Sequence, residues 1–513
     1  MMSHIVIAPV ILPLLFGIVL LLLQKQPLLF QRVLSITSVV AQVVLAVGLL
    51  HRVSNGEILV YALGNWSPPF GIVLVADRLA AWMLIITALL SLCALLYAVR
   101  GTDAEGSHFH VLFQLQLFGL NGAFLTGDLF NLFVFFEILL LASYSLLLHG
   151  GGRLRTKAGL HFVVINLVGS TLFLFAVGTL YGILGTLNMA DLAVKVAATP
   201  LEQVALVRVA GLLLFAVFAL KAALLPLYLW LPAAYAHTTA PVAALFAIMT
   251  KVGAYSILRV YTLIFGEQAG PAADLIEAWL LPLALTTLVA GMLGAVASIR
   301  LRQQIAYLVM ASVGSLLVAF GLNTSVGIAA GLYYLPHSTF AVAAFFLLAD
   351  SIAKRRGEMN DKFDLGPTMA YQRLFGVLFF IVAVLVAGLP PLSGFVGKFL
   401  ILQAALTHPA LPWILGIVLI TSLFALIALA RSGSLMFYRA EPPQVSKLTT
   451  VTNTPVGLMP VMGELLSIIV LLSLCLILVV WAGPITDFTL ATADQLLQPD
   501  TYVHAVLGSG AKY

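Results

Sequence analysis

The stretch LKAALLPLYLWLPAAYAHTTAPVAALFAIMTK, residues 220–251, decides how this chain is interpreted. It places two lysines, Lys221 and Lys251, inside apolar sequence and separates them by a segment that prolines interrupt. A lysine in the middle of a bilayer costs roughly 2.5–3.5 kcal/mol to insert, and a proline removes a backbone donor, so both features need compensation from neighbouring helices. The combination indicates a protein that moves ions. A lysine near a helix end can instead extend to the interface, but Lys251 lies near the middle of an apolar run over 240–263.

The composition of the chain excludes a soluble protein. Of its 513 residues, 62% are hydrophobic and only 9% are charged, which is too little polar sequence to cover a soluble globule of this size. The two cysteines, Cys93 and Cys475, lie far apart in apolar runs, so the sequence predicts neither a disulfide framework nor a thiolate metal site. No G-x-x-x-x-G-K-[ST] loop occurs, and we expect no cofactor and no ATP-driven transport.

Hydropathy predicts an all-α polytopic membrane protein with about fourteen transmembrane helices of roughly 20 residues each. The predicted spans are 4–24, 31–51, 73–99, 108–126, 129–149, 160–185, 204–226, 240–263, 275–298, 305–323, 327–353, 373–407, 411–436 and 463–483. The twelfth span is too long for one straight helix, and its GLPPLSG at 388–394 predicts a break into two halves. Similar sequences open at 159 and at 331, five spans apart, which is typical of inverted repeats.

The basic residues divide unequally when successive connections are placed on alternate sides of the membrane. One side carries Lys25, Arg32, Arg100, Arg153, Arg155, Lys157, Arg300, Arg302, Lys354, Arg355, Arg356, Lys362, Arg373, Arg431, Arg439 and Lys447. The other side carries Arg52, Arg78, Lys195, Arg208, Arg259 and Lys512. Because cytoplasmic loops hold the excess of Lys and Arg, this distribution predicts external termini. The net charge of +5 then reflects topology, and we expect no nucleic-acid partner.

Five residues with proton-exchanging side chains lie deep in the predicted spans: Glu137, Lys221, Lys251, His337 and Lys398. A buried carboxylate must be neutral or paired, and lysine can release its proton where arginine stays charged. The set therefore predicts a proton relay near the membrane mid-plane. Two simpler explanations stay open. Glu137 and Lys221 can form one fixed ion pair, and the only partner of His337 can be the carbonyl that Pro336 frees.

Other ionisable residues are weaker candidates. Asp77, Arg78, Asp128, Arg259 and Asp350 lie near the ends of predicted spans, where a solvated or interfacial charge is the simpler interpretation. His237, in the connection YAHTTAP, has a side chain whose ordinary pKa near 6.5 suits it to pass protons toward Lys251. An exposed loop histidine with no role is the competing explanation.

Four blocks carry a family resemblance. They are GDLFNLFVFFEILLLASYSLLL (127–148), FALKAALLPLYLWLPAAYAHTTAPVAALFAIMTKVGAY (218–255), LRQQIAYLVMASVG (301–314) and AGLPPLSGFVGKF (387–399). They closely resemble the antiporter-like subunits shared by Mrp-type multisubunit cation/proton antiporters and respiratory complex I, and within that family the D-type Mrp subunits. The resemblance covers roughly residues 78–439. It implies two inverted repeats of about five helices each, with broken seventh and twelfth helices. It also implies a Glu137–Lys221 pair, from which Lys251, His337 and Lys398 continue the proton path.

The resemblance also implies a function and a location. We expect a secondary transporter subunit, not an enzyme, that exchanges Na+ or K+ for protons together with other membrane subunits in a bacterial cytoplasmic membrane. A proton-pumping subunit of a complex I-type quinone oxidoreductase is the alternative, and a mainly structural membrane subunit is a third. The expected organisation is N-terminal helices over 1–107, a first repeat over 108–263, a second repeat over 264–440, and a last helix with a short tail over 441–513. No oxygen cage for the cation is visible in the sequence.

Overall fold

The computed structural model describes residues 3–364, 368–438 and 458–508, and helices dominate them. The first helices are α1 (Ala8–Leu22), α2 (Leu28–Val53), α3 (Arg78–Ala98), α4 (Phe109–Leu125), α5 (Leu129–Leu148), α6 (Arg153–Leu184), α7 (Met189–Ala197), α8 (Leu201–Ala222), α9 (Trp230–His237), α10 (Ala240–Phe246) and α11 (Met249–Leu263). They are followed by α12 (Glu277–Ala297), α13 (Leu301–Phe320), α14 (Ser325–Arg355), α15 (Gln372–Ala387), α16 (Ser393–Ala404), α17 (Leu411–Gly433), α18 (Leu458–Val480), α19 (Ala482–Leu496) and α20 (Pro499–Leu507). Strands β1 (Leu59–Ala62) and β2 (Val73–Ala76) form one antiparallel pair.

The helices agree with the hydropathy prediction. Every predicted span overlaps a helix, and 11 helical segments of the described residues are long and apolar enough to cross a membrane. α1, α4, α15 and α16 are shorter apolar helices. The chain is therefore an all-α polytopic membrane protein, as predicted. The prediction missed the β-hairpin and the helices α7, α9, α19 and α20, because short or amphipathic segments give no long hydrophobic run.

Two charges near span ends act as helix caps. Asp77 precedes α3, and its carboxylate accepts a hydrogen bond of 2.9 Å from the backbone N–H of Ala80. Asp128 precedes α5 and accepts one of 2.8 Å from the backbone N–H of Asn131. The first N–H groups of a helix lack intrahelical acceptors, so an aspartate at this position stabilises the helix start. These two caps fix where α3 and α5 begin.

Two helical breaks lie at the proline-containing segments that stood out in the sequence. α8 ends at Ala222, Ala223 takes a left-handed conformation with φ of 60°, and α9 begins only at Trp230. α15 ends at Ala387, Gly388 has φ of 81°, and α16 begins at Ser393, within GLPPLSG. Each break frees backbone carbonyls at a helix end, where they can accept hydrogen bonds from buried side chains.

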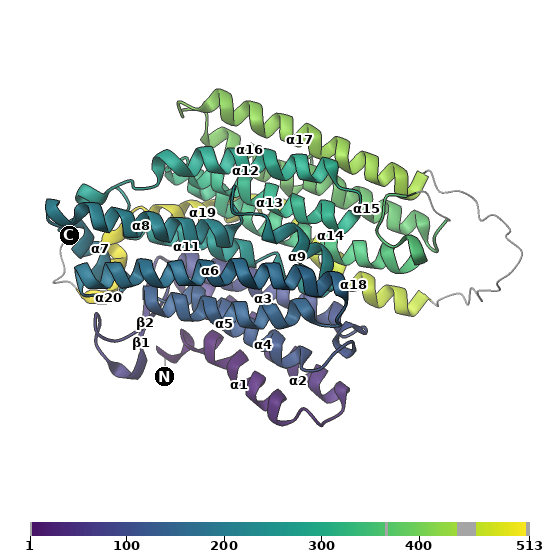
Figure 1. The fold of residues 1–513 in the computed structure, drawn as a ribbon, viewed down its shortest axis with the longest axis horizontal. Helices are drawn as coiled ribbons and strands as arrows, with labels where there is room; N and C mark the ends of the chain where they lie inside the picture. Colours follow the sequence, from purple (N-terminus) through teal and green to yellow (C-terminus); the bar gives the residue numbers. More distant parts are fainter. Residues whose placement is uncertain (1–2, 365–367, 439–457, 509–513) are drawn as a thin grey trace, which may run out of the picture.

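The most enclosed helices lie in the middle of the bundle, with α1 and α2 at one edge and α17 at the opposite edge (Figure 1). The apolar windows of 240–263 and of α14 are 100% buried, whereas those of α2 and α17 are 33% buried. The exposed apolar side chains of the edge helices therefore face lipid or other subunits. A polar group on α11 or α14 has only protein or trapped water as a partner.

The strands β1 and β2 and the helices α7 and α20 lie at the same end of the bundle (Figure 1). Which membrane face this end meets stays a prediction from the charge distribution. Of the basic residues used for that prediction, Arg439, Lys447 and Lys512 lie outside the described residues, as does the predicted boundary at 440/441. The inverted repeats and the boundaries at 107/108 and 263/264 also stay predictions.

Candidate functional site

Glu137 and Lys221 meet through helix α6. The Oε1 atom of Glu137, on α5, accepts a hydrogen bond from the Ser170 hydroxyl of α6. One turn earlier, Asn166 Oδ1 accepts a hydrogen bond of 3.1 Å from Nζ of Lys221 on α8. Residues four apart share one face of a helix, so α6 places two neutral polar groups between the acid and the lysine. The direct Glu137–Lys221 ion pair that the resemblance implies is therefore absent between these two described residues.

Lys221 is buried, with 6% of its surface exposed. Its Nζ also lies 5.9 Å from the centre of the Phe136 ring, and Asn166 donates a hydrogen bond of 2.8 Å to the carbonyl of Phe162. This bond uses the amide nitrogen and leaves the amide oxygen for the lysine. Lys221 occupies the last turn of α8, where the helix dipole favours a positive charge. The lysine does not extend to the interface.

Lys251 lies on α11 with no exposed surface, and its Nζ has no hydrogen-bond partner among the described residues. The neighbouring Thr250 hydroxyl also lacks one. Two residues further, a Cβ on Gly253 would lie 2.4 Å from the backbone nitrogen of Ala222. The backbone of α11 therefore packs directly against the end of α8, next to Lys221. Buried polar groups without protein partners are normally satisfied by water, so one water molecule beside Lys251 would satisfy it.

His337, in the middle of α14, is 2% exposed. Its Nδ1 lies 2.9 Å from the Ser393 hydroxyl at the start of α16, and its ring lies 5.4 Å from that of Tyr334. Gly394 allows this approach, because a Cβ there would lie 3.0 Å from Nε2 of the imidazole. The partner of His337 therefore comes from another helix, and the explanation that relies only on the carbonyl freed by Pro336 is wrong.

Lys398 lies on α16, just after the second break. Its Nζ donates hydrogen bonds of 2.8 Å to the Ala387 carbonyl, at the end of α15, and of 3.0 Å to the Ser422 hydroxyl. A cavity of about 30 Å³ is lined by Lys398, His337 and Ser422, among other residues. This volume admits about one water molecule. Lys398 and His337 thus share one small internal space.

Four of the five predicted residues form two polar groups: α6 connects Glu137 and Lys221, and one cavity is shared by His337 and Lys398. Lys251 bonds to neither group. The linking groups that the sequence analysis missed are Asn166, Ser170, Ser393 and Ser422. A hydroxyl can rotate and can both donate and accept, so these groups and internal water are suited to passing protons.

Arg259 and Asp77 form a buried ion pair, which corrects the interpretation of both as solvated charges. Their side chains lie 2.7 Å apart and are 4% and 2% exposed. The guanidinium of Arg259 also lies 5.3 Å from the centre of the Tyr502 ring of α20. Residues far apart in the sequence thus meet at this end of the bundle. The pair joins α3 to α11 and leaves no uncompensated charge.

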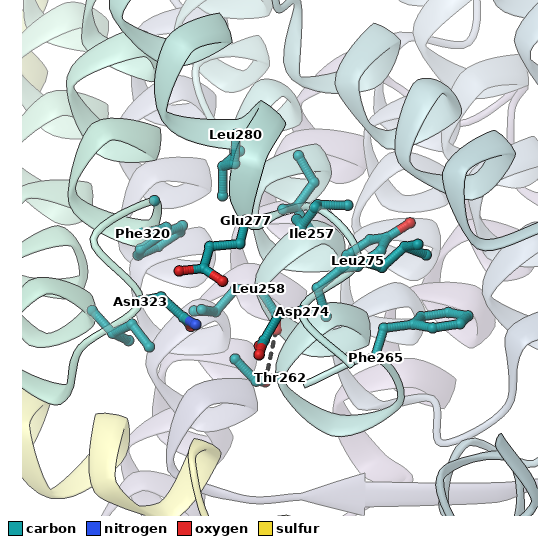
Figure 2. A pocket seen from close by; sticks show the side chains of 14 residues that line it. Ile257, Leu258, Thr262, Phe265, Asp274, Leu275, Glu277, Leu280, Phe320 and Asn323 are labelled. Atoms are coloured by element: carbon teal, nitrogen blue, oxygen red, sulfur yellow. Dashed lines mark hydrogen bonds between the residues drawn. The ribbon is translucent and has the colours of Figure 1, made fainter. Parts of the chain in front are cut away.

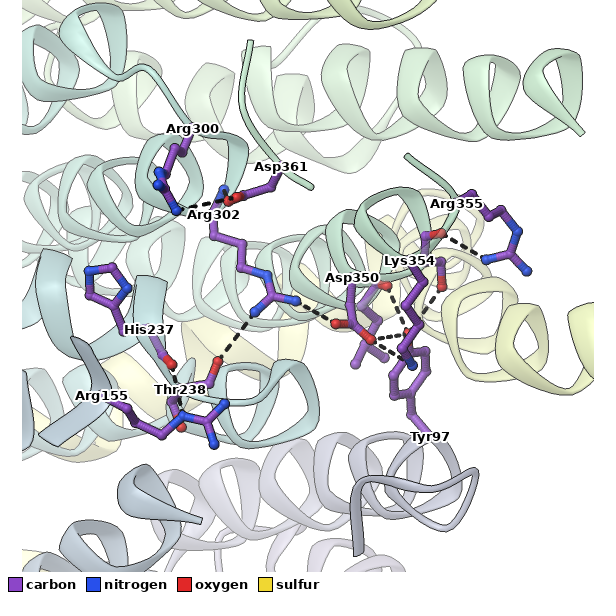
Figure 3. A network of polar contacts seen from close by, with 12 residues as sticks. Tyr97, Arg155, His237, Thr238, Arg300, Arg302, Asp350, Lys354, Arg355 and Asp361 are labelled. Atoms are coloured by element: carbon purple, nitrogen blue, oxygen red, sulfur yellow. Dashed lines mark hydrogen bonds and ion pairs between the residues drawn. The ribbon is translucent and has the colours of Figure 1, made fainter. Parts of the chain in front are cut away.

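Asp350 is also paired and not solvated (Figure 3). Its carboxylate contacts Arg302 and accepts bonds of 2.9 Å from Lys354 and 2.8 Å from the Tyr97 hydroxyl. His237 lies nearby at the end of α9, half-buried. Burial and the charge of Arg300 lower the pKa of His237 below its ordinary value. No contact in the structure joins His237 to Lys251, so its predicted part in proton transfer stays a prediction.

A small pocket lies away from these groups, between α11, α12 and the end of α13 (Figure 2). Its volume is about 40 Å³, and Asp274, Glu277 and Asn323 are among its mostly apolar lining residues. It contains none of the five predicted relay residues. Within the described ranges no cluster of three or more His, Cys, Asp or Glu side chains could hold a metal ion.

The comparisons with known proteins agree with this geometry. The family described as NADH:quinone oxidoreductase/Mrp antiporter, TM, matches residues 126–425. The D-type subunit of a probable K(+)/H(+) antiporter of Rhizobium meliloti (strain 1021) is 39% identical over 541 residues, covering 99% of this chain and 98% of that protein. The D-type subunit of a Na(+)/H(+) antiporter of Alkalihalophilus pseudofirmus is 38% identical, covering 99% of this chain and 100% of that protein.

A solved structure shows the same fold. One chain in the structure of the Mrp complex from Dietzia sp. DQ12-45-1b superposes with a TM-score of 0.84 at 28% identity, covering 99% of each chain. The match over residues 126–425 includes all five predicted relay residues and both helical breaks. On these similarities, the chain belongs to the family of NADH:quinone oxidoreductase and Mrp antiporter transmembrane subunits.

Proposed function

We propose that this chain is the proton-translocating subunit of a multisubunit antiporter that exchanges Na+ or K+ for protons. One observation carries the proposal: two lysines are buried in the bundle, one of which, Lys251, has no partner among the described residues, and the partly buried Lys398 shares a small cavity with His337. Such an arrangement is costly for a purely structural role, because an uncompensated buried charge destabilises a fold. The names of the two antiporter relatives support the exchange of a monovalent cation for protons.

The proposed path has three stages. A proton enters the group of Glu137, Ser170 and Asn166, and its arrival or departure changes the charge that Lys221 faces. Water around Lys251 then connects the two halves of the path. His337 and Lys398 complete the path through their shared cavity. Lysine suits these positions because it can release and take up a proton, whereas arginine does not release its proton.

Exchange requires partners. The described chain forms no domain outside the membrane bundle, and the edge helices expose apolar faces that suit lipid or other membrane subunits. We propose that the other subunits complete the cation path, since no carboxylate cluster for a cation occurs in the described part of this chain. The location is a bacterial cytoplasmic membrane, with both termini external.

The test uses the whole complex in everted vesicles that carry a pH-sensitive dye. Addition of Na+ or K+ to a respiration-acidified vesicle should release protons through the intact complex. A complex in which Lys398→Met replaces the last lysine should assemble but release none. Proton release at the normal rate by that assembled variant would refute the proposed relay.

The complex I-type alternative has one supporting observation, since the matching family includes subunits of both kinds of complex. Identification of the chains that copurify separates the two functions. Quinone-reducing and iron–sulfur subunits would indicate the redox enzyme, and membrane subunits alone would indicate the antiporter.

A further inference from the structure

A large cavity opens at the end of the bundle that the distribution of Lys and Arg residues assigns to the cytoplasm. Its volume is about 700 Å³, far larger than the two internal cavities near the relay and α12. Four segments enclose it: 151–155 at the start of α6, Leu229 with one face of α9, 300–307 at the start of α13, and residues 360–361. Its size corresponds to a site for an organic molecule and exceeds that of a single water site.

The lining of this cavity is strongly basic. Four arginines line it, Arg153, Arg155, Arg300 and Arg302, against a single lining carboxylate, that of Asp361. Asp361 lies 4.0 Å from Arg300, too far for a good hydrogen bond. Four guanidinium groups around one carboxylate leave the cavity with an excess of positive charge.

The contacts of the other arginines reduce this excess without removing it. Arg155 donates to the backbone carbonyls of His149 and His237, and the carboxylate of Glu105, which does not line the cavity, acts on it electrostatically. Arg302 pairs with Asp350 outside the cavity, and its buried Nε has no acceptor among the described residues. Arg153 is exposed and forms no ion pair with any described residue.

Burial first, and then the charges of Arg300, Arg302 and Arg155, lower the pKa of His237, although Asp361 opposes this shift. The first turn of α6 also starts in the cavity, after Gly151 and Gly152, and its N–H groups have no intrahelical acceptor. Free N–H groups at a helix start attract anions.

The rim of the cavity indicates where the anion comes from. Leu154 is 56% exposed and Leu229 is 63% exposed, and both line the cavity next to the side of the bundle formed by α6 and α9. A soluble anion has no apolar part that would contact these leucines. A phospholipid has both parts: its phosphate lies at the membrane surface, and its acyl chain lies along apolar side chains. Basic pockets between transmembrane helices on the cytoplasmic side recognise anionic headgroups.

We infer that this cavity binds the phosphate headgroup of an anionic phospholipid through Arg153, Arg300 and Arg302, with an acyl chain along Leu154 and Leu229. The excess of Lys and Arg at cytoplasmic ends does not by itself explain the cavity. Topology requires only that basic residues lie at that end of the bundle. It does not require that four arginines from two distant segments line the same cavity. The site is separate from the proposed relay.

The test measures lipid retention by the purified whole complex. The complex is delipidated in detergent, mixed with defined ratios of phosphatidylglycerol and phosphatidylcholine, and the retained lipid is counted by native mass spectrometry. The Arg153→Gln/Arg300→Gln variant should bind phosphatidylglycerol about tenfold or more weakly, since charge-assisted hydrogen bonds are lost. The Arg153→Lys/Arg300→Lys variant should retain most of the binding, because it keeps both charges.

A matched control removes the same charge at the same end of the bundle. Lys25 and Arg373 are exposed and line no cavity described above, so Lys25→Gln/Arg373→Gln should leave the affinity unchanged. Equal loss in the control and the cavity variant would overturn the site, as would equal retention in both. Displacement of phosphatidylglycerol by millimolar inorganic phosphate would overturn the lipid source and indicate a soluble anion. Size-exclusion chromatography of each variant confirms assembly, and the measurement needs no antiport activity.

Discussion

Asn166 and Ser170, one turn apart on α6, hold Lys221 and Glu137 respectively, so that a single helix face connects the base to the acid. This relationship changes how the pair must act. Two charges in direct contact stabilise each other and resist change, whereas two charges separated by neutral hydrogen-bonding groups interact more weakly. A proton on either side then alters the other without a rigid ion pair having to break.

The first substitutions test Asn166 and Ser170, which connect Lys221 to Glu137. Asn166→Leu removes the acceptor of Lys221 and should slow cation-dependent proton release about tenfold or more, since an unsatisfied buried donor costs roughly 1–3 kcal/mol. Ser170→Ala should have a smaller effect, because Glu137 is only half-buried. Ser145→Ala is the control, since this exposed α5 hydroxyl bonds only to its own helix. Proton release at the normal rate by the Asn166→Leu variant would show that α6 takes no part in the proton path.

Glu137 should act by exchanging a proton. Glu137→Gln preserves size and the acceptor for Ser170 but cannot ionise, whereas Glu137→Asp keeps the acid on a shorter side chain. We expect loss of exchange in the Gln variant and partial exchange in the Asp variant, measured by dye fluorescence in everted vesicles. A Gln variant that transports at the normal rate would show that Glu137 is only a hydrogen-bond acceptor.

Lys221→Arg distinguishes a proton carrier from a fixed positive charge. Arginine can still donate to Asn166 and lie over Phe136, so the complex should assemble. Arginine holds its proton far more tightly than lysine does, so exchange should fail. Assembly is followed on native gels of the same membranes that are used for transport. Near-normal exchange by this variant would make Lys221 an electrostatic support.

Lys251 and Arg259, two turns apart on α11, should respond to methionine in opposite ways. Lys251→Met removes a charge that has no partner among the described residues, so thermal stability of the purified complex should be kept or rise while exchange is lost. Arg259→Met leaves Asp77 buried and unpaired, which should destabilise the fold by about 3–5 kcal/mol. Thermal unfolding of both variants provides the comparison. A large loss of stability in Lys251→Met would indicate an essential structural contact.

Topology can be tested with introduced cysteines. Both native cysteines are buried, so background labelling should be low. With external termini, a cysteine at the exposed Glu358 should react with a membrane-impermeant maleimide only from the cytoplasmic side, and one at the exposed Glu202 only from outside. Labelling of both positions from the same side would contradict the predicted arrangement of spans.

The sequence predicts the spans and the buried charges because both depend on the cost of placing each residue in a bilayer, which hydropathy measures directly. It does not reveal the partners. Ser170 resembles Thr171 and Thr179 of the same helix, yet those two bond to their own backbone. Whether a hydroxyl in a helix faces a distant acid depends on packing that no local pattern records.

The errors at the span ends have the same origin. Asp77 and Arg259 are far apart in the chain, and each taken singly is most simply placed at the interface. Only the three-dimensional fold, which brings the start of α3 near α11, joins them in a buried pair. The cap made by Asp128 could have been expected from its position before a hydrophobic run.

The contact between Gly253 and Ala222 has a mechanical consequence. The glycine lets the two backbones touch, because any added carbon would lie 2.4 Å from the Ala222 nitrogen. The backbones that carry Lys221 and Lys251 therefore meet with no side chain of residue 253 between them. A larger residue at 253 would push α11 away from the end of α8 and so increase the separation of the two lysines.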